Sequence, residues 1–236
     1  MNKISRYAEL SKKYDYLFAK EQPFAYSTEC FQKVLINLEY VNLDGHQKVI
    51  QFTSTLANEG KSTLISNMAY LLGQKGKKVV VIDLDLRIPK LHRVFNATNR
   101  LGLTDYLAGK IEFDRLIRHS EKIGIDYIVS GEKTSAVINI LESKKLSALI
   151  DQLKESYDYI LLDTPPVLAV SDALFIAKIT DGIIFVVAQG QTKKALVREA
   201  ISTLKNKHVN IIGFILNKVK LNNSGYGYGY DYKYEE

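Results

Sequence analysis

Short apolar runs alternate with amphipathic stretches along most of this 236-residue chain. The runs are rich in valine and isoleucine and apolar at consecutive positions, which is typical of parallel strands covered by helices on both faces. They lie at Val49–Thr53, Val79–Asp83, Tyr127–Val129, Tyr159–Asp163, Ile183–Ala188 and Ile211–Leu216. Alternating strands and helices predict an α/β fold, with a doubly wound, mostly parallel sheet between two layers of helices.

A helix is predicted before the first strand. Residues 28–43 carry apolar side chains at helical spacing, and Ser27 or Thr28 is suited to be the N-cap. Residues 1–26 are polar and rich in tyrosine and lysine, so we expect a flexible or docking extension there. The sequence therefore predicts one domain over residues 27–219, followed by a flexible tyrosine-rich tail over residues 220–236.

Composition indicates a globular protein from a reducing compartment. The chain is 46% hydrophobic and 25% charged, which is ordinary for a protein with a core. Its one cysteine, Cys30, excludes an internal disulfide, and the four scattered histidines give no metal-site spacing. No apolar run approaches the ~20 residues needed to span a bilayer, and the N-terminus lacks the apolar core of a signal peptide. We expect a cytoplasmic protein that reaches a membrane only through another molecule.

The net charge of +6 is concentrated in one segment. Residues 75–100 hold seven Lys or Arg against two Asp, whereas both ends of the chain are nearly balanced. Such an excess attracts phosphate or another acidic partner. A basic surface that is merely solvated would show the same sequence pattern. Because the chain has no basic arm, we do not expect nucleic acid as a partner.

A phosphate-binding loop is indicated at "STLANEGKST", residues 54–63. The loop follows a predicted strand and precedes a helix expected to begin near Lys61, which is the context a P-loop requires. Its backbone N–H groups favour an anion, Lys61 would reach the β- and γ-phosphates, and the hydroxyl of Ser62 would bind magnesium. Two residues depart from the full pattern, because Thr55 replaces a glycine and Asn58 stands where glycine is common. Asparagine tolerates a positive φ better than most residues. The predicted nucleotide-binding residues of the loop are Asn58, Glu59, Gly60, Lys61, Ser62 and Thr63.

Carboxylates follow two further predicted strands. "VVVIDLDLRIPKLH" places Asp83 and Asp85 at a strand end, with Arg87 two residues on, and "YILLDTPP" places Asp163 at another. Ligands of α/β sheets bind outside the carboxyl ends of the strands, and magnesium prefers oxygen ligands. A single aspartate there is more often a helix N-cap, but three beside a P-loop predict a magnesium site.

The chain closes with "GYGYGYDYKYEE", in which tyrosine occupies every second position. The five are Tyr226, Tyr228, Tyr230, Tyr232 and Tyr234. Period-two spacing is the strand pattern, but the intervening glycines weaken a strand. Two interpretations remain, a disordered and adhesive tail or a set of tyrosines that are chemically modified.

Three segments together resemble the bacterial tyrosine kinases, or BY-kinases: the P-loop, a D-x-D-x-R-x-P segment and a D-T-P-P segment. "GLTDYLAG", "SDALFIAKITDGIIFVV" and "IIGFILNKV" are also similar to that family, and the resemblance covers most of residues 27–236. It implies a P-loop kinase that uses ATP and Mg²⁺ to phosphorylate its own C-terminal tyrosines. It also implies a link to capsule and exopolysaccharide production.

The resemblance assigns a role to each matching position. Lys61 would bind phosphate and stabilise the transferred charge, while Asp85 and Asp163 would hold the magnesium. Asp83 would accept the proton of the tyrosine hydroxyl or orient that hydroxyl. Arg87 would pair with phosphate or with a neighbouring subunit.

The resemblance also implies partners. They are a membrane-anchored activator with a cytosolic tail, protein tyrosine substrates, and further copies of the chain in a ring that phosphorylates tails in trans. The family commonly carries E-x-x-R-x-x-R before the P-loop, which is implicated in ring assembly. The corresponding residues here are Glu29, Gln32 and Leu35, so both arginines are absent. Lys33 is a weak substitute, because its geometry differs from that of arginine.

Two other nucleotide-dependent classes are alternatives. A partitioning or septum-positioning ATPase would carry a second lysine five residues before Lys61, where this chain has Leu56, and would lack the tyrosine tail. A GTPase would read guanine with N-K-x-D, but "NKVK" at residues 217–220 ends in Lys220 instead of aspartate. Asn217 remains a candidate to approach the adenine edge.

Overall fold

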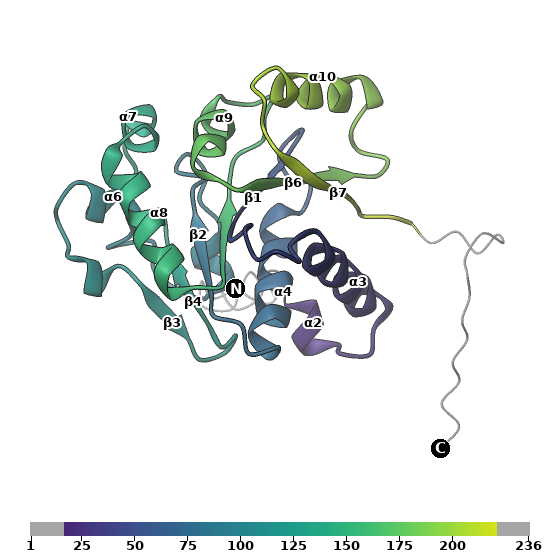
Figure 1. The fold of residues 1–236 in the computed structure, drawn as a ribbon, viewed down its shortest axis with the longest axis horizontal. Coiled ribbons are helices and arrows are strands. Elements are labelled where there is room, and N and C mark those ends of the chain that lie inside the picture. Colours follow the sequence, from purple (N-terminus) through teal and green to yellow (C-terminus); the bar gives the residue numbers. More distant parts are fainter. Residues whose placement is uncertain (1–16, 221–236) are drawn as a thin grey trace, which may run out of the picture.

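The computed structural model describes residues 17–220, and it contains a seven-stranded sheet with helices on both sides (Figure 1). The strands are β1 (Val49–Ser54), β2 (Val79–Asp83), β3 (Arg118–Ser120), β4 (Ile125–Ile128), β5 (Tyr159–Asp163), β6 (Gly182–Ala188) and β7 (Ile211–Asn217). Their order is β3-β4-β2-β5-β1-β6-β7, and all neighbours run parallel except β3 and β4. The predicted doubly wound, mostly parallel sheet is confirmed.

Helices connect the strands in the expected α/β alternation. The α-helices are α2 (Phe18–Glu21), α3 (Tyr26–Val41), α4 (Lys61–Gln74), α5 (Leu91–Val94), α6 (Leu103–Leu107), α7 (Val137–Leu141), α8 (Lys144–Ser156), α9 (Asp172–Ile176) and α10 (Lys194–Lys205). Two single 3₁₀ turns are η1 (Phe113–Arg115) and η2 (Ala177–Ile179). In the described part of the chain, no helix combines the length and apolarity needed to cross a bilayer.

All six predicted strands form, each within two residues of its expected bounds. β3 was not predicted, because its three residues, Arg118–Ser120, contain no apolar run. It pairs antiparallel with β4 at the edge of the sheet. An edge strand pairs with only one other strand and is less buried, so its sequence need not show the apolar run by which strands are predicted.

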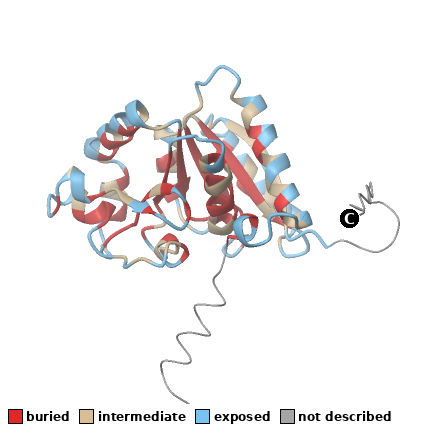
Figure 2. Ribbon diagram, turned by 90° about the horizontal axis from the view of Figure 1, so that it is seen from below, coloured by how far each residue is buried: buried red, intermediate tan, exposed pale blue. Residues whose placement is uncertain are grey.

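Successive strand residues enter two different cores, which explains why the strands are apolar at consecutive positions. In β2, Val79 and Val81 pack with helices α3 and α4, whereas Val80 and Ile82 pack with helix α8 on the opposite face. Figure 2 shows the result as a buried sheet between helices whose outer surfaces are exposed. Because side chains alternate across a strand, burial of both faces requires an unbroken apolar run.

Ordered structure begins nearer the N-terminus than the sequence indicates. Leu17 is buried, and the amide of Ala19 donates to the side chain of Asn67 on α4 at 2.8 Å. The expected extension over residues 1–26 therefore gives way to structure from residue 17, while residues 1–16 and 221–236 lie outside the described range. The predicted N-cap is also wrong, because α3 begins at Tyr26 and Thr28 donates its hydroxyl to the carbonyl of Gln22 at 2.6 Å.

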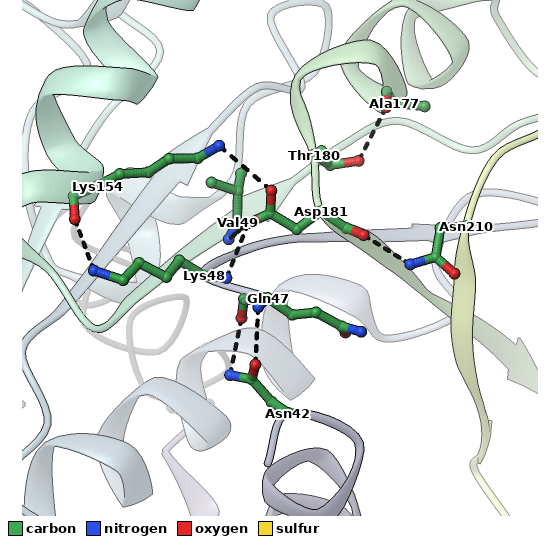
Figure 3. Close-up of polar contacts among 9 residues, drawn as sticks. All are labelled: Asn42, Gln47, Lys48, Val49, Lys154, Ala177, Thr180, Asp181 and Asn210. Carbon is green, nitrogen blue, oxygen red and sulfur yellow. Dashed lines mark hydrogen bonds and ion pairs between the residues drawn. The ribbon is translucent and has the colours of Figure 1, made fainter. Parts of the chain in front are cut away.

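The amino-terminal edge of the sheet is tied together by Asp181, which directly precedes β6 (Figure 3). Its Oδ2 accepts the backbone N–H groups of Lys48 and Val49 at 2.9 and 2.7 Å. Its Oδ1 lies 3.4 Å from Nζ of Lys154, and its carbonyl accepts from the side chain of Asn210 at 2.8 Å. One aspartate thus joins the starts of β1 and β6 to α8 and to the approach to β7.

We predict that Asp181→Ala lowers the free energy of unfolding by about 2–3 kcal/mol, because two backbone donors lose their acceptor. Asp181→Asn retains one acceptor oxygen and should cost about 1 kcal/mol or less. Urea denaturation of the three proteins measures the difference. Equal stability of the alanine variant and the unaltered chain would contradict this account.

Candidate active site

The P-loop runs from the end of β1 to the start of α4 and contains two left-handed residues. Asn58 has φ 63° and Gly60 has φ 96°, so the asparagine takes the conformation expected for it. Gly60 is also required by space, because a Cβ there would lie 2.1 Å from Nδ2 of Asn217. Thr55, the other departure from the pattern, is fully buried and leaves this backbone path intact.

A pocket of about 350 Å³ opens beside the P-loop. It is lined by Asn58, Gly60, Lys61, Ser62, Thr63, Lys90, Arg93, Val94 and Lys218. Four of these residues are cations and none is an acid. Together with the N-terminus of α4, they make the pocket an anion site.

The ammonium group of Lys61 is largely buried from solvent. Its side chain is 8% exposed and its Nζ donates to Oγ of Ser54 at 3.0 Å. Burial lowers the pKa of Lys61, while the nearby carboxylates of Asp163 and Asp85 raise it. A buried ammonium paired with only a neutral hydroxyl is prepared to bind an anionic phosphate.

Ser62 and Asp163 meet at the centre of the site. The hydroxyl of Ser62 donates to Oδ2 of Asp163 at 2.5 Å, whereas Oδ1 of this buried carboxylate has no partner. Burial raises the pKa of Asp163 to about 6, against the opposing influence of Lys61 and of the Ser62 hydroxyl. A hydroxyl oxygen beside an unpartnered carboxylate oxygen fits a magnesium ion.

The metal would not be held by protein carboxylates alone. Within residues 17–220, no group of three or more His, Cys, Asp or Glu is arranged to hold a metal ion. Phosphate oxygens and water would therefore complete the coordination, which is usual for magnesium in phosphoryl-transfer sites. The assignment of Ser62, Asp85 and Asp163 as the protein ligands of the metal stays a prediction.

Asp83 and Asp85 follow β2, where Asp83 lies in register with Asp163 on the adjacent strand. Asp83 is fully buried, and its Oδ2 accepts the amides of Lys90 and Leu91 at 3.0 Å each. Burial and the charge of Asp163 raise the pKa of Asp83 well above its usual range. These contacts fix the loop that follows β2, and both roles expected for Asp83, to accept the tyrosine proton or to orient the hydroxyl, stay predictions.

Asp85 is half-buried and accepts the amide of Ile88 at 3.0 Å. Burial raises the pKa of Asp85, and the charges of Lys61 and Lys90 oppose the rise. Arg87 points elsewhere, because its guanidinium makes two hydrogen bonds, of 2.7 and 3.0 Å, to the buried carboxylate of Asp172 on α9. The structure therefore gives Arg87 a bond within the fold, and its proposed phosphate contact stays a prediction.

Glu59 was predicted from its position in the loop, but its side chain does not line the pocket. The buried carboxylate accepts the amides of Leu56 and Ala188 at 2.8 and 3.0 Å and also the hydroxyl of Thr192. Asn217 donates its Nδ2 to the carbonyl of Glu59 at 2.8 Å. These bonds couple the P-loop to the carboxyl ends of β6 and β7, a link that no local motif reveals.

Lys218 was not among the predicted site residues, and Lys90 and Arg93 appeared only within the basic excess of residues 75–100. That excess was the one available signal for them, and its phosphate interpretation is supported by their position. Lys218 comes from the other end of the domain, where "NKVK" pointed to Asn217 but gave Lys218 no role.

The raised pKa of Asp163 means that the folded protein binds this proton more tightly than the unfolded chain does. Stability is therefore lost as the pH rises from about 4 to about 6, and the loss is complete above that range. We predict that Asp163→Asn, measured in EDTA at pH 7.5, unfolds with a free energy about 1–3 kcal/mol higher than the unaltered chain. The gain should vanish near pH 4. A variant that is less stable than the unaltered chain, or a gain in unfolding free energy that does not change with pH, would contradict this account.

Comparison with known proteins identifies the family and the fold. The model of the AAA domain family matches residues 47–212. Tyrosine-protein kinase YwqD of Bacillus subtilis is 35% identical over 208 residues, which cover 87% of this chain and 86% of that protein. Several longer curated tyrosine-protein kinases match 84–91% of this chain, which spans only 27–29% of their length.

Solved structures have the same fold. The kinase domain of Escherichia coli tyrosine kinase ETK superposes with a TM-score of 0.84 at 31% identity, covering 91% of this chain and 84% of that one. The chimerical protein CapA2B2 gives 0.82 at 28% identity, covering 86% and 90%. The septum site-determining protein MinD of Pyrococcus horikoshii, solved with Mg-ADP, gives only 0.61 at 26% identity, covering 72% and 69%. The chain thus belongs to the bacterial tyrosine-protein kinases, and it shares with MinD the underlying nucleotide-binding fold.

Proposed function

We propose that this tyrosine-protein kinase transfers the γ-phosphoryl group of ATP to its own C-terminal tyrosines. The cationic pocket beside Ser62 and Asp163 is the observation that carries the proposal. Position supports the choice of acceptors. β7 ends at Asn217, which contacts the P-loop, so the described part of the chain ends within three residues of this site.

Each described residue has a part in the proposed reaction. Lys61 binds the β- and γ-phosphates, and Ser62 and Asp163, with Asp85 nearby, hold the magnesium that neutralises phosphate charge. The phenolic oxygen forms a bond to the γ-phosphorus as the bond to the ADP oxygen breaks. The phenolic proton passes to a carboxylate of this cluster, for which Asp83 is the candidate.

The acceptors are Tyr226, Tyr228, Tyr230, Tyr232 and Tyr234, which lie outside the described residues. Each phosphate adds about −1.5 to −2 charges at neutral pH. Full modification would turn a nearly neutral tail into a polyanion, which we propose repels neighbouring tails and loosens an assembly of subunits.

We further propose that the kinase regulates capsule or exopolysaccharide synthesis from the inner face of the membrane, where a membrane-anchored activator holds it. The family resemblance supports this setting. Assembly would differ from the usual ring contact, because Leu35 is buried in the core while Glu29 and Gln32 are exposed on α3. The position of the second arginine of E-x-x-R-x-x-R is thus a packing position in this chain.

Incubation with Mg²⁺ and ATP should place several phosphates on the tail of the purified protein, as measured by intact mass and peptide sequencing. Lys61→Met should reduce incorporation by about 100-fold or more, because the charge of the transferred group loses its main partner. Replacement of all five tail tyrosines by phenylalanine is the control, and it should leave ATP binding unchanged. Phosphate that persists in either variant would refute self-phosphorylation of the tail, and ATP turnover without phosphotyrosine would indicate an assembly ATPase.

Transfer between subunits is tested by mixing. The Lys61→Met chain, which keeps its tail, is combined with the catalytically intact chain that carries five phenylalanines. We expect phosphate on the tail of the Lys61→Met chain at a rate that rises with protein concentration. A tail that stays unmodified in this mixture would show that transfer occurs only within one chain.

A further inference from the structure

The pocket beside the P-loop contains two lysines that no P-loop pattern accounts for. Nζ of Lys90 donates to Oδ1 of Asn58 at 3.0 Å. Nζ of Lys218 donates to the backbone carbonyl of the same asparagine at 2.6 Å and to Oε1 of Gln191 at 3.0 Å. Two ammonium groups therefore bind one left-handed P-loop residue, and both line the space where phosphate is expected.

Lys90 is positioned by a fixed backbone. Its own amide donates to the buried carboxylate of Asp83 at 3.0 Å, and the amide of Leu91 donates to the same oxygen. The loop that carries Lys90 is thus anchored at the carboxyl end of β2. The ammonium then reaches Asn58 of the P-loop, which follows β1, two strands away in the sheet.

The charge of Lys90 acts on the carboxylates that are proposed to hold magnesium. Burial is the main cause of the pKa shifts of Lys61, Asp85 and Asp163, and the charge of Lys90 lowers the pKa of each of the three. Lys218 comes from the other side, because it directly follows Asn217 at the end of β7. The two lysines therefore reach the same P-loop asparagine from different strand ends, Lys90 from the loop after β2 and Lys218 from the end of β7.

The present partner of Lys90 is a neutral amide oxygen, which is a weak substitute for an anion. Hydrogen bonds to ionised acceptors are roughly twice as strong as those between neutral groups. A phosphate oxygen in this pocket would therefore displace Asn58 as the acceptor, and a lysine has the rotational freedom to follow it.

We propose that Lys90 is a second phosphate-binding lysine, which leaves Asn58 when ATP enters and donates to the terminal phosphate. It adds to Lys61 a second cation on the group that is transferred. The inference rests on the proposed nucleotide site, and it goes beyond it by assigning discrimination between ATP and ADP to one residue outside the P-loop. Lys218, which reaches Asn58 from the end of β7, would act on both nucleotides alike.

Binding measurements separate these roles without any kinase assay. Dissociation constants for Mg²⁺ complexes of a non-hydrolysable ATP analogue and of ADP are measured by calorimetry. The proteins are the unaltered chain, Lys90→Met, Lys90→Arg and Lys218→Met. Methionine keeps the main-chain bond to Asp83, and urea denaturation confirms that each variant is folded.

Lys90→Met should weaken binding of the ATP analogue about ten-fold or more while changing ADP binding by less than about three-fold, and Lys90→Arg should retain most of the discrimination. Lys218→Met should change both affinities by the same factor. Equal losses for the two nucleotides in Lys90→Met would overturn this inference and leave the proposed function standing. Selective loss in a protein that transfers no phosphate would sustain the inference and overturn the proposed function. Failure of the unaltered chain to bind either nucleotide would overturn both.

Discussion

A buried carboxylate, Asp163, meets the hydroxyl of Ser62 at the carboxyl edge of the sheet, and the rest of the site is arranged around this contact. The contact exists because β1 and β5 are parallel neighbours, with Phe52 in register with Asp163, so that the P-loop and the aspartate leave the sheet side by side. Burial of an anion is costly unless a cation or donor compensates. The carboxylate keeps one oxygen without a partner, so the fold maintains an incompletely satisfied acid at the place where a metal would complete it.

The surrounding structure holds this arrangement in place. Asp83, in register with Asp163, accepts hydrogen bonds from three backbone amides and so fixes the loop after β2. Glu59 joins the P-loop to the end of β6, and Asn217 joins it to the end of β7. The incompletely satisfied carboxylate of Asp163 lies at the carboxyl edge of the sheet, whereas the opposite edge is tied by the bonds of Asp181. An unsatisfied buried acid is expected where function opposes stability.

Local patterns were sufficient to predict the sheet, the P-loop helix and the strand-end aspartates, because burial on both faces leaves an unmistakable apolar run. Local patterns failed where contacts between residues far apart in the sequence determine the structure. β3 is a polar edge strand, and residues 17–25 are ordered by contact with α4, which lies some 40 residues further along the chain. The partner of Arg87 is Asp172, 85 residues away, so a motif that places Arg87 near phosphate cannot show that its guanidinium is already engaged. The position of Lys218 likewise depends on the topology of β7 and not on its neighbours in sequence.

The central claim is that Ser62 and Asp163 hold a divalent cation together with the phosphates of ATP. The most direct test is electron paramagnetic resonance of Mn²⁺, used in place of Mg²⁺, with the unaltered protein and with Asp163→Asn, in the presence and absence of ATP. The account predicts tight Mn²⁺ binding only when ATP is present, weakened by about ten-fold or more in the variant. Equal Mn²⁺ affinity in the two proteins would show that the metal is held elsewhere and would contradict the assignment of this edge as the active site.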